Sequence, residues 1–184
     1  AYSERPFDDP ALQSARKAVE LVLAGHEPYP ALAIDRHWTL IAYNKAVLPL
    51  MAGADPSLLQ PPVNVLRLSL HPKGLAPRIA NLAEWRSHLF ARLRRQIEVS
   101  ADPVLEELLN ELSGYPMHDV GEASHNEEYA GVVVPFRFIT EQGVLSFIST
   151  TTIFGTPVDI TLSELAVESF FPADAATAMA LRGL

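Results

Sequence analysis

Cysteine is absent from the 184-residue sequence, and this absence excludes disulfide bonds, cysteine-ligated zinc and thiol catalysis. Long apolar runs are also absent, because polar residues interrupt every stretch before it reaches the roughly 20 residues of a membrane-spanning helix. The first residues lack the apolar segment of a secretory signal. Together these absences predict a cytoplasmic protein that contacts no membrane.

Recognisable catalytic motifs are missing as well. There is no Gly-x-Ser-x-Gly, no phosphate-binding Gly-Lys-Ser/Thr loop and no His-Glu-x-x-His. Ser14 and Lys17 match a Ser-x-x-Lys pattern, but they lie in an amphipathic segment, and no Ser-Asp-Asn or Lys-Thr-Gly follows. Glu107 and Glu111 are one helical turn apart, as on a solvated helix face. We therefore expect no enzyme, no catalytic residues and no cofactor.

A polar stretch over residues 115–130 contains the best candidates for metal ligands. Imidazole and carboxylate groups suit zinc, iron or manganese. The spacing matches no strong metal-binding signature, so we favour an acidic surface loop and predict no metal site. A metal-dependent hydrolase that uses His118 and His125 stays as an alternative. The candidate ligands are His118, Asp119, Glu122, His125, Glu127 and Glu128.

The charge is acidic overall but divided along the chain. The formal net charge is -8. Residues 36–95 contain nine Lys or Arg against two Asp or Glu, whereas residues 98–184 contain two against fourteen. The acidic balance argues against this chain being the DNA-binding part of a protein. We interpret the charged stretches as solvated faces, with an anion or partner at the basic stretch as the alternative.

The spacing of apolar residues predicts helices and strands in a definite order. The short apolar piece 66–70 fits either type. Thr140 to Gly143 has the length and composition of a hairpin loop. The predicted helices cover residues 10–24, 45–52, 77–99, 103–113 and 175–181, and the predicted strands cover residues 31–34, 38–44, 131–139, 144–154 and 162–171.

This order predicts an α+β fold in which one five-stranded antiparallel sheet carries helices on one face. A helical insert separates the second and third strands. The PAS sensor fold has the same element order, so we expect a PAS-like sheet. We place a linker and helix in residues 1–29 and the PAS-like domain in residues 30–184.

Several segments, in this order, resemble the MmyB-like transcription regulator ligand-binding domain. In that family an apolar strand leads through Asp and Trp to Asn-x-Ala, as Asp35, Trp38 and Asn44 do here. The resemblance covers nearly the whole chain from about residue 30. The segments that carry it are residues 30–46, 62–68, 71–72, 85–95, 149–159 and 165–174.

The resemblance implies a bacterial transcription regulator. In such proteins an XRE-type helix-turn-helix domain precedes a PAS-like domain that binds fatty-acid-like or other small apolar molecules. No helix-turn-helix motif is recognisable here, so we expect DNA contact only through a missing N-terminal domain. We expect a homodimer, and a dimerisation module without ligand is the alternative.

The expected ligand site is an apolar pocket with a few polar anchors. Arginines near apolar stripes are the natural partners of a fatty-acid carboxylate, because guanidinium binds carboxylate through two hydrogen bonds. Aromatic and aliphatic residues of the sheet and the long helix would form the walls. The predicted ligand-binding residues are Arg67, Arg78, Trp85, Arg86, Leu89, Arg92, Phe136, Phe138, Phe147 and Thr150.

Overall fold

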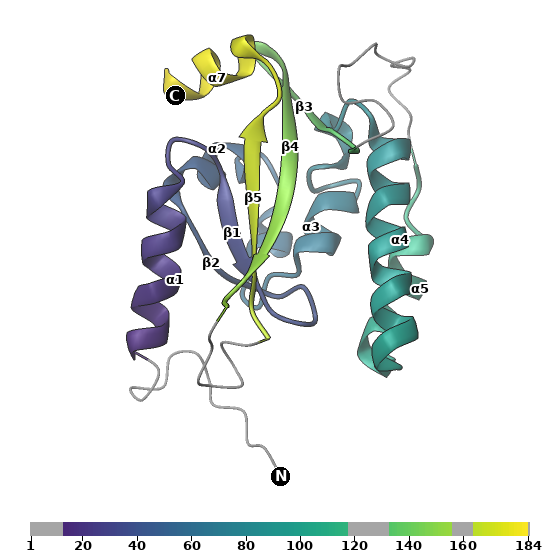
Figure 1. The fold of residues 1–184 in the computed structure, drawn as a ribbon. Coiled ribbons are helices and arrows are strands. Elements are labelled where there is room, and N and C mark those ends of the chain that lie inside the picture. Colours follow the sequence, from purple (N-terminus) through teal and green to yellow (C-terminus); the bar gives the residue numbers. More distant parts are fainter. Residues whose placement is uncertain (1–12, 118–132, 156–163, 184) are drawn as a thin grey trace.

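The computed structural model describes residues 13–117, 133–155 and 164–183. Five strands and the described helices follow one another along the chain in the predicted order (Figure 1). The strands are β1 (Ala31–Ile34), β2 (Leu40–Tyr43), β3 (Phe136–Thr140), β4 (Gly143–Ile153) and β5 (Ala166–Pro172). The α-helices are α1 (Gln13–Gly25), α2 (Leu48–Met51), α3 (Val65–Leu70), α4 (Leu82–Ser100), α5 (Pro103–Ser113) and α7 (Ala175–Arg182). Short 3-10 turns are η2 (Lys45–Val47), η3 (Pro56–Leu59) and η4 (Ala76–Arg78).

The strands form one curled antiparallel sheet in the order β2-β1-β5-β4-β3. The last strand in the sequence, β5, therefore lies in the centre, between β1 and β4. The α+β class, the five antiparallel strands and the helical insert between β2 and β3 are confirmed. The closer likeness to the PAS fold stays a prediction, as does the domain boundary near residue 30.

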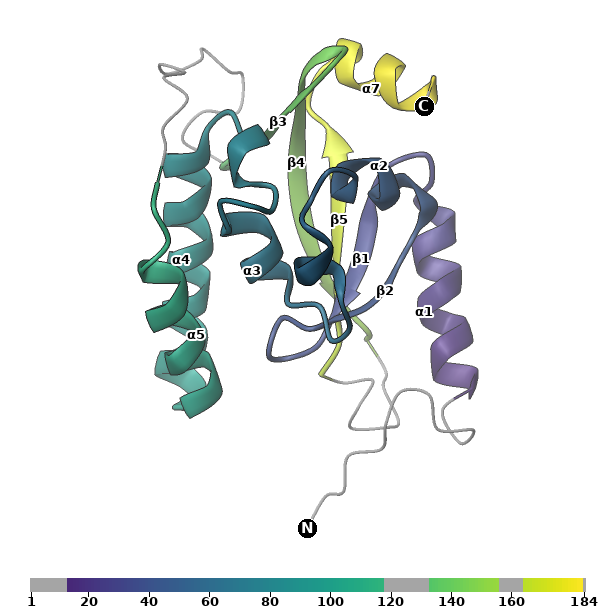
Figure 2. The ribbon, with the colours of Figure 1, turned by 180° about the vertical axis from the view of Figure 1, so that it is seen from behind.

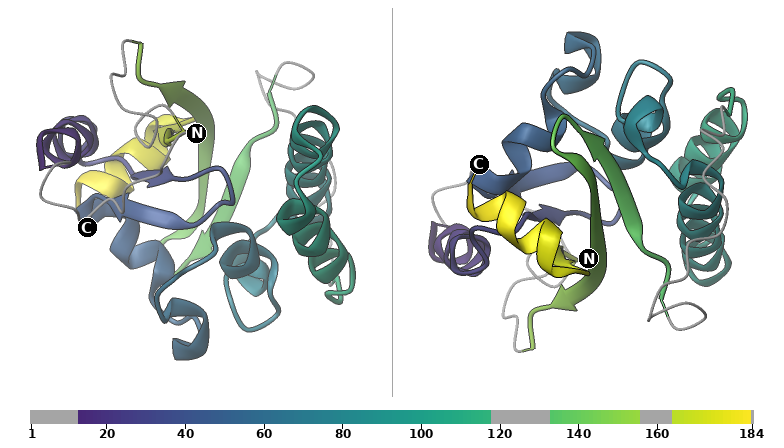
Figure 3. Two further views of the ribbon diagram at one scale, coloured as in Figure 1. Left: turned by 90° about the horizontal axis from the view of Figure 1, so that it is seen from below. Right: turned by 90° about the horizontal axis from the view of Figure 1, so that it is seen from above.

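Helices cover both faces of the sheet, which corrects the expectation of helices on one face alone. On the inner face, α2, α3, α4 and α5 enclose the larger hydrophobic core, and Figure 2 shows α2 and α3 in front of the strands. On the outer face, Val19 and Leu23 of α1 pack against Ala31, Ala33 and Val167. The end-on views of Figure 3 show α1 and α4 on opposite sides of the sheet. The sheet is thus a single layer between the inner core and α1.

Local capping explains where several helices begin. The Asn64 side chain accepts from the backbone N–H of Arg67, which decides that the ambiguous apolar piece is the helix α3. Asp102 caps α5 in the same way, with Pro103 at the first helical position. Asp174 caps α7.

The longest helix, α4, begins at Leu82, five residues after the start at residue 77 that the apolar spacing predicted. Ile79 forms a bridge with Phe138. The backbone N–H of Ala80 donates to the carbonyl of Arg137 at 2.8 Å. Ile79 and Ala80 are therefore held by the edge strand β3, and the Ala80 N–H is not available to a helix. The strand predicted from residue 131 begins at Phe136, with residues 131–132 outside the described ranges.

Within the three described ranges, no helix is long and apolar enough to cross a membrane.

Candidate ligand-binding cavity

An apolar cavity of about 80 Å³ lies between the inner face of the sheet and the helices α2, α3 and α4. Leucine, valine, proline and methionine side chains form most of its wall. Five aromatic residues also line it: Trp38, Trp85, Phe136, Phe147 and Phe170. Among the residues that the structure describes, four polar ones reach it: Ser69, Arg92, Ser149 and Glu168. An enclosed apolar space with few polar groups is the usual form of a small-molecule site.

One end of the cavity is aromatic. Phe136 and Phe147 are paired residues of β3 and β4, and Phe170 comes from β5. The ring centroids of Phe147 and Phe170 lie 6.1 and 5.8 Å from that of Phe136, both in edge-to-face geometry. The Trp85 ring of α4 packs against Phe136 with a centroid distance of 5.1 Å. Edge-to-face aromatic pairs favour defined orientations. This end is therefore a stiff apolar wall.

The other end holds a buried ion pair. Glu168 of β5 accepts a hydrogen bond from Arg92 of α4 at 2.5 Å and one from the Thr151 hydroxyl of β4 at 2.8 Å. The side chain of Glu168 is 5% exposed and that of Arg92 is 24% exposed. Trp85, Leu89 and Arg92 follow one another at four- and three-residue spacing, so one face of α4 carries all three to the cavity.

Trp38 closes the cavity beside the ion pair. Its ring lies under the Arg92 guanidinium, 4.7 Å from the ring centroid, and its Nε1–H donates to Gln96 at 2.6 Å. Its carbonyl accepts from the Val65 N–H at 2.9 Å. Trp38 has φ +68°, a strained conformation for a bulky residue, which these contacts hold in place. The position of this indole is therefore set by several contacts at once.

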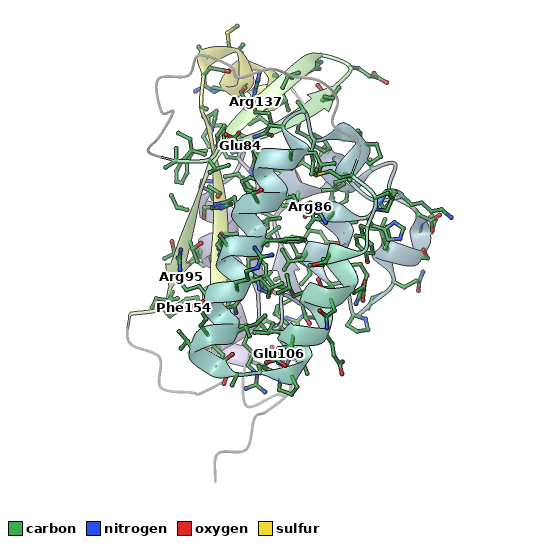
Figure 4. The ribbon with its side chains drawn as sticks, turned by 90° about the vertical axis from the view of Figure 1, so that its right-hand side faces the viewer. Glu84, Arg86, Arg95, Glu106, Arg137 and Phe154 are labelled. Carbon is green, nitrogen blue, oxygen red and sulfur yellow. The ribbon has the colours of Figure 1, made fainter. Side chains whose placement is uncertain are left out.

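Outside Trp38 and Arg92 lies a second, more open groove of about 510 Å³. These two residues line both spaces, so they separate the inner cavity from the groove. Arg95 and Glu164 lie in the groove, and Glu164 pairs with Arg36 at 3.0 Å. Figure 4 looks onto α4 and α5 and labels Arg95 on the exposed side of α4.

The family model of the MmyB-like transcription regulator ligand binding domain matches residues 15–184. The chain belongs to this family. Its membership makes the chain a regulatory ligand-binding domain of transcription regulators, and this is not a known enzyme family. A search of curated proteins found no match. The enclosed cavity is accordingly the candidate site of this MmyB-like domain.

Five of the ten predicted site residues line the cavity, and they come from three separate parts of the fold. Because no ligand is present, the binding role of each stays a prediction. The five are Trp85, Leu89, Arg92, Phe136 and Phe147.

The remaining predicted arginines lie elsewhere. Arg67 donates to the Glu111 carboxylate from Nε and Nη2, at 2.6 and 2.9 Å, on the protein surface. Arg78 lies 4.9 Å from the ring centroid of Phe138, away from the cavity. Arg86 donates to the carbonyl of Ser113. Spacing along the sequence could not show that Arg92 reaches the cavity and the other arginines do not, because this depends on which face of each helix meets the sheet.

Two predicted sheet residues are also outside the cavity. Phe138 is buried in the core beside the start of α4. Thr150 is exposed and lies between Ser149 and Thr151 in β4. These two neighbours face α4, so Thr150 points to the opposite face of the sheet. The strand period of two places neighbours on opposite faces, so a one-residue shift decides whether a side chain reaches the cavity.

The predicted site residues did not include Trp38, Ser149, Glu168 and Phe170, which all line the cavity. A signal was present for the last two. Alternation along residues 165–171 places Leu165 and Val167 on one face, so Glu168 and Phe170 share the other. A charged residue between Val167 and Phe170 in a predicted strand is unusual, and its burial needs a partner.

The ion pair also affects the neighbouring His88. Burial lowers the pKa of His88, and the positive charge of Arg92 lowers it further, while the Glu168 carboxylate acts in the opposite direction. The His88 ring packs against that of Trp85 in a tilted arrangement, with the ring centroids 5.1 Å apart. Desolvation and a nearby cation both favour the neutral imidazole.

The predicted metal candidates around His118 and His125 lie outside the described residues. In the parts of the chain that the structure describes, no group of three or more His, Asp or Glu side chains is placed to hold a metal ion.

Proposed function

We propose that this domain binds a small apolar, alkyl-rich molecule in the cavity and transmits its presence to a DNA-binding domain attached before α1. The observation that carries the proposal is the enclosed apolar cavity in a member of a ligand-binding regulator family. The fatty-acid-like ligand follows from the resemblance noted in the sequence.

Ligand entry requires the cavity to grow. Its volume of about 80 Å³ is below the roughly 300–1,000 Å³ of typical ligand sites. Leu50 and Met51 belong to the four-residue helix α2 and are only partly buried. Met is unbranched and adapts to irregular spaces. We expect these two side chains to move outward, because the aromatic end and the ion pair are held by neighbours.

The outer face of the sheet supports the coupling. Along β5, Glu168 and Phe170 face the cavity, whereas Val167 packs against α1. His26, just after α1, donates from Nε2 to the carbonyl of Phe170 at 2.8 Å. A ligand that shifts β5 therefore acts on the contacts that hold α1. It can shift the balance between two positions of α1 only as far as it binds one of the two conformations more tightly.

Native mass spectrometry of the purified chain, followed by hydrogen exchange over α1 with and without saturating ligand, tests the proposal. We expect a co-purified apolar molecule and slower exchange in residues 13–25 when it is bound. Unchanged exchange at saturation would contradict the coupling. A protein that binds no apolar compound in a broad thermal-shift screen would contradict the binding.

The proposed regulator acts as a homodimer, as the sequence led us to expect. Sedimentation velocity of the ligand-free and ligand-bound chain tests this, and a monomer in both states would refute it.

A further inference from the structure

We propose that two copies of this chain pair along the open edge of strand β4, residues 149–153, so that their two sheets join into one. The inference rests on the proposed function, because it names the surface that forms the homodimer. Three features of the sheet carry it: the covering of its other edges, the direction of the backbone groups of β4, and the composition of residues 149–153.

Neighbouring backbone covers the two outer strands of the sheet, β2 and β3. At β2, the N–H of Leu40 donates to the carbonyl of Val63 at 2.8 Å. At β3, the carbonyl of Arg137 accepts from the N–H of Ala80 at 2.8 Å. Each outer strand is therefore bonded to a segment outside the sheet, as natural proteins commonly arrange to prevent pairing with other chains.

Strand β4 extends well beyond its short neighbour β3 (Figure 1). β3 pairs with residues 143–147 of β4, and from there to Ile153 the strand pairs with β5 alone. In the part of the chain that the structure describes, residues 149–153 form no backbone hydrogen bond on the side of β3. Thr150 to Ile153 are also exposed. This stretch is thus an uncovered edge of the sheet.

The backbone of β4 presents hydrogen-bonding groups to this edge at every second residue. The carbonyl of Ser146 accepts from the N–H of Ala173, directly after β5, at 2.8 Å, so Ser146 faces β5. The pairing of β4 with β5 continues without a shift of register to Ile153. Hydrogen bonds alternate between the two sides of a strand, so Ser149, Thr151 and Ile153 each direct one N–H and one C=O to the open edge.

A second copy of the same stretch matches these groups in number and in spacing. The three outward-facing residues are arranged symmetrically about Thr151. A two-fold axis there pairs Thr151 with its counterpart and Ser149 with Ile153 of the second copy, in antiparallel direction, so that every outward N–H and C=O finds a partner. The second strand ends opposite Ser149, and it therefore does not reach the positions that β3 occupies opposite residues 143–147.

The composition of residues 149–153 also favours pairing between copies. Exposed edge strands are usually protected by a lysine, a proline or a bulge. Residues 149–153 read Ser-Thr-Thr-Thr-Ile, without charge or proline, and their register with β5 has no bulge. Threonine and isoleucine favour strands, and Ile153 is 69% exposed. No like charges would meet across the two-fold axis.

Two lysine variants of the same strand test the inference by sedimentation velocity. Ile153→Lys places a charge at the open edge, and we expect it to raise the dissociation constant of the dimer at least about tenfold, which corresponds to about 1.4 kcal/mol. Val144→Lys adds the same charge at a residue that is 39% exposed and pairs with Ile139 of β3. We expect this control to dimerise as the wild type does, and Ile153→Val to do so as well.

Hydrogen exchange of single amides, followed by NMR, reports the pairing itself. We expect the amides of Ser149 and Thr151 to exchange at least about tenfold faster in Ile153→Lys than in the wild-type dimer, because they lose their partners. The amides of Thr150 and Thr152 face β5 and should exchange equally slowly in both proteins. If Ile153→Lys does not fold, dilution of the wild type to the monomer takes its place, with the same alternation expected.

The outcomes separate this inference from the proposed function. A wild-type dimer that Ile153→Lys leaves intact, with fast exchange at Ser149 and Thr151, would overturn the inference and leave the homodimer standing. Equal weakening by both lysine variants would also overturn it, because the effect would then come from net charge. A monomeric wild type would overturn the homodimer together with the inference, whereas the binding of an apolar ligand is measured separately. Slow exchange at Ser149 and Thr151 in such a monomer would mean that another segment of the chain covers the edge.

Discussion

Two leucines one helical turn apart on α4 offer a direct test of whether the cavity is empty space. Leu93 is fully buried, and Leu89 is 4% exposed. Leu89 lines the cavity and Leu93 does not. Replacing each by Ala removes the same atoms from the same helix, with the same change in helix propensity. The pair therefore isolates the effect of the hollow.

The expected magnitudes follow from what surrounds each side chain. A buried Leu→Ala substitution costs about 2–5 kcal/mol, and the cost is larger where more packing contacts disappear. Leu93 is in contact on all sides, so we expect about 4 kcal/mol for L93A. Leu89 faces a hollow of about 80 Å³, where it has no partner atoms to lose. We therefore expect about 2–3 kcal/mol for L89A.

Urea unfolding of refolded, ligand-free protein measures the difference. With a slope of about 2 kcal/mol per molar, a gap of 1 kcal/mol shifts the midpoint by roughly 0.5 M. We also expect saturating 1-hexanol to stabilise L89A more than L93A, because only L89A enlarges the ligand space. If L89A loses as much stability as L93A, the cavity is collapsed in solution and the packing argument is refuted.

Three further predictions concern charged and titratable groups. Arg92→Met leaves the carboxylate of Glu168 buried without its partner and should cost about 3 kcal/mol of stability. Arg67→Met breaks an exposed pair and should cost less than about 1 kcal/mol. Equal losses of stability in urea titrations of the two variants would contradict the role of burial. NMR titration should give His88 a pKa below its ordinary 6.5, so its contribution to stability is full above pH 6.5 and falls as the pH drops further; a raised pKa would refute the desolvation argument. Burial, with a neighbouring carboxylate, raises the pKa of Tyr115 to about 12. The chain has five tyrosines, so absorbance titrations of the wild type and of Tyr115→Phe are compared, and the two should show equal phenolate near pH 10. Stability should fall between pH 10 and 12, and a loss of phenolate at pH 10 in Tyr115→Phe would be inconsistent with the contact.

Local patterns in the sequence were sufficient for most of the secondary structure. Period-two and period-3.6 apolar spacing act over a few residues, so strands and helices could be placed within short segments. Asp102 and Asp174 cap helices with their own side chains, which is also a local effect. The start of α4 was misplaced because Ile79 and Ala80 bond to a strand more than fifty residues away.

The sequence by itself determined the class of fold, an acidic, cysteine-free α+β domain, because composition and periodicity are properties of the chain alone. Its place among ligand-binding regulator domains rests on the resemblance of ordered segments to that family and on the match of the family model. The tertiary structure alone decided which residues face the cavity. Glu168 and Arg92 are 76 positions apart and meet only because β5 enters the centre of the sheet and α4 crosses its inner face. Strand register then turns Ser149 toward the cavity and Thr150 away from it. Helix orientation brings Arg92 to the cavity and leaves Arg67 on the surface. These choices depend on how distant elements pack, and no local pattern encodes that packing.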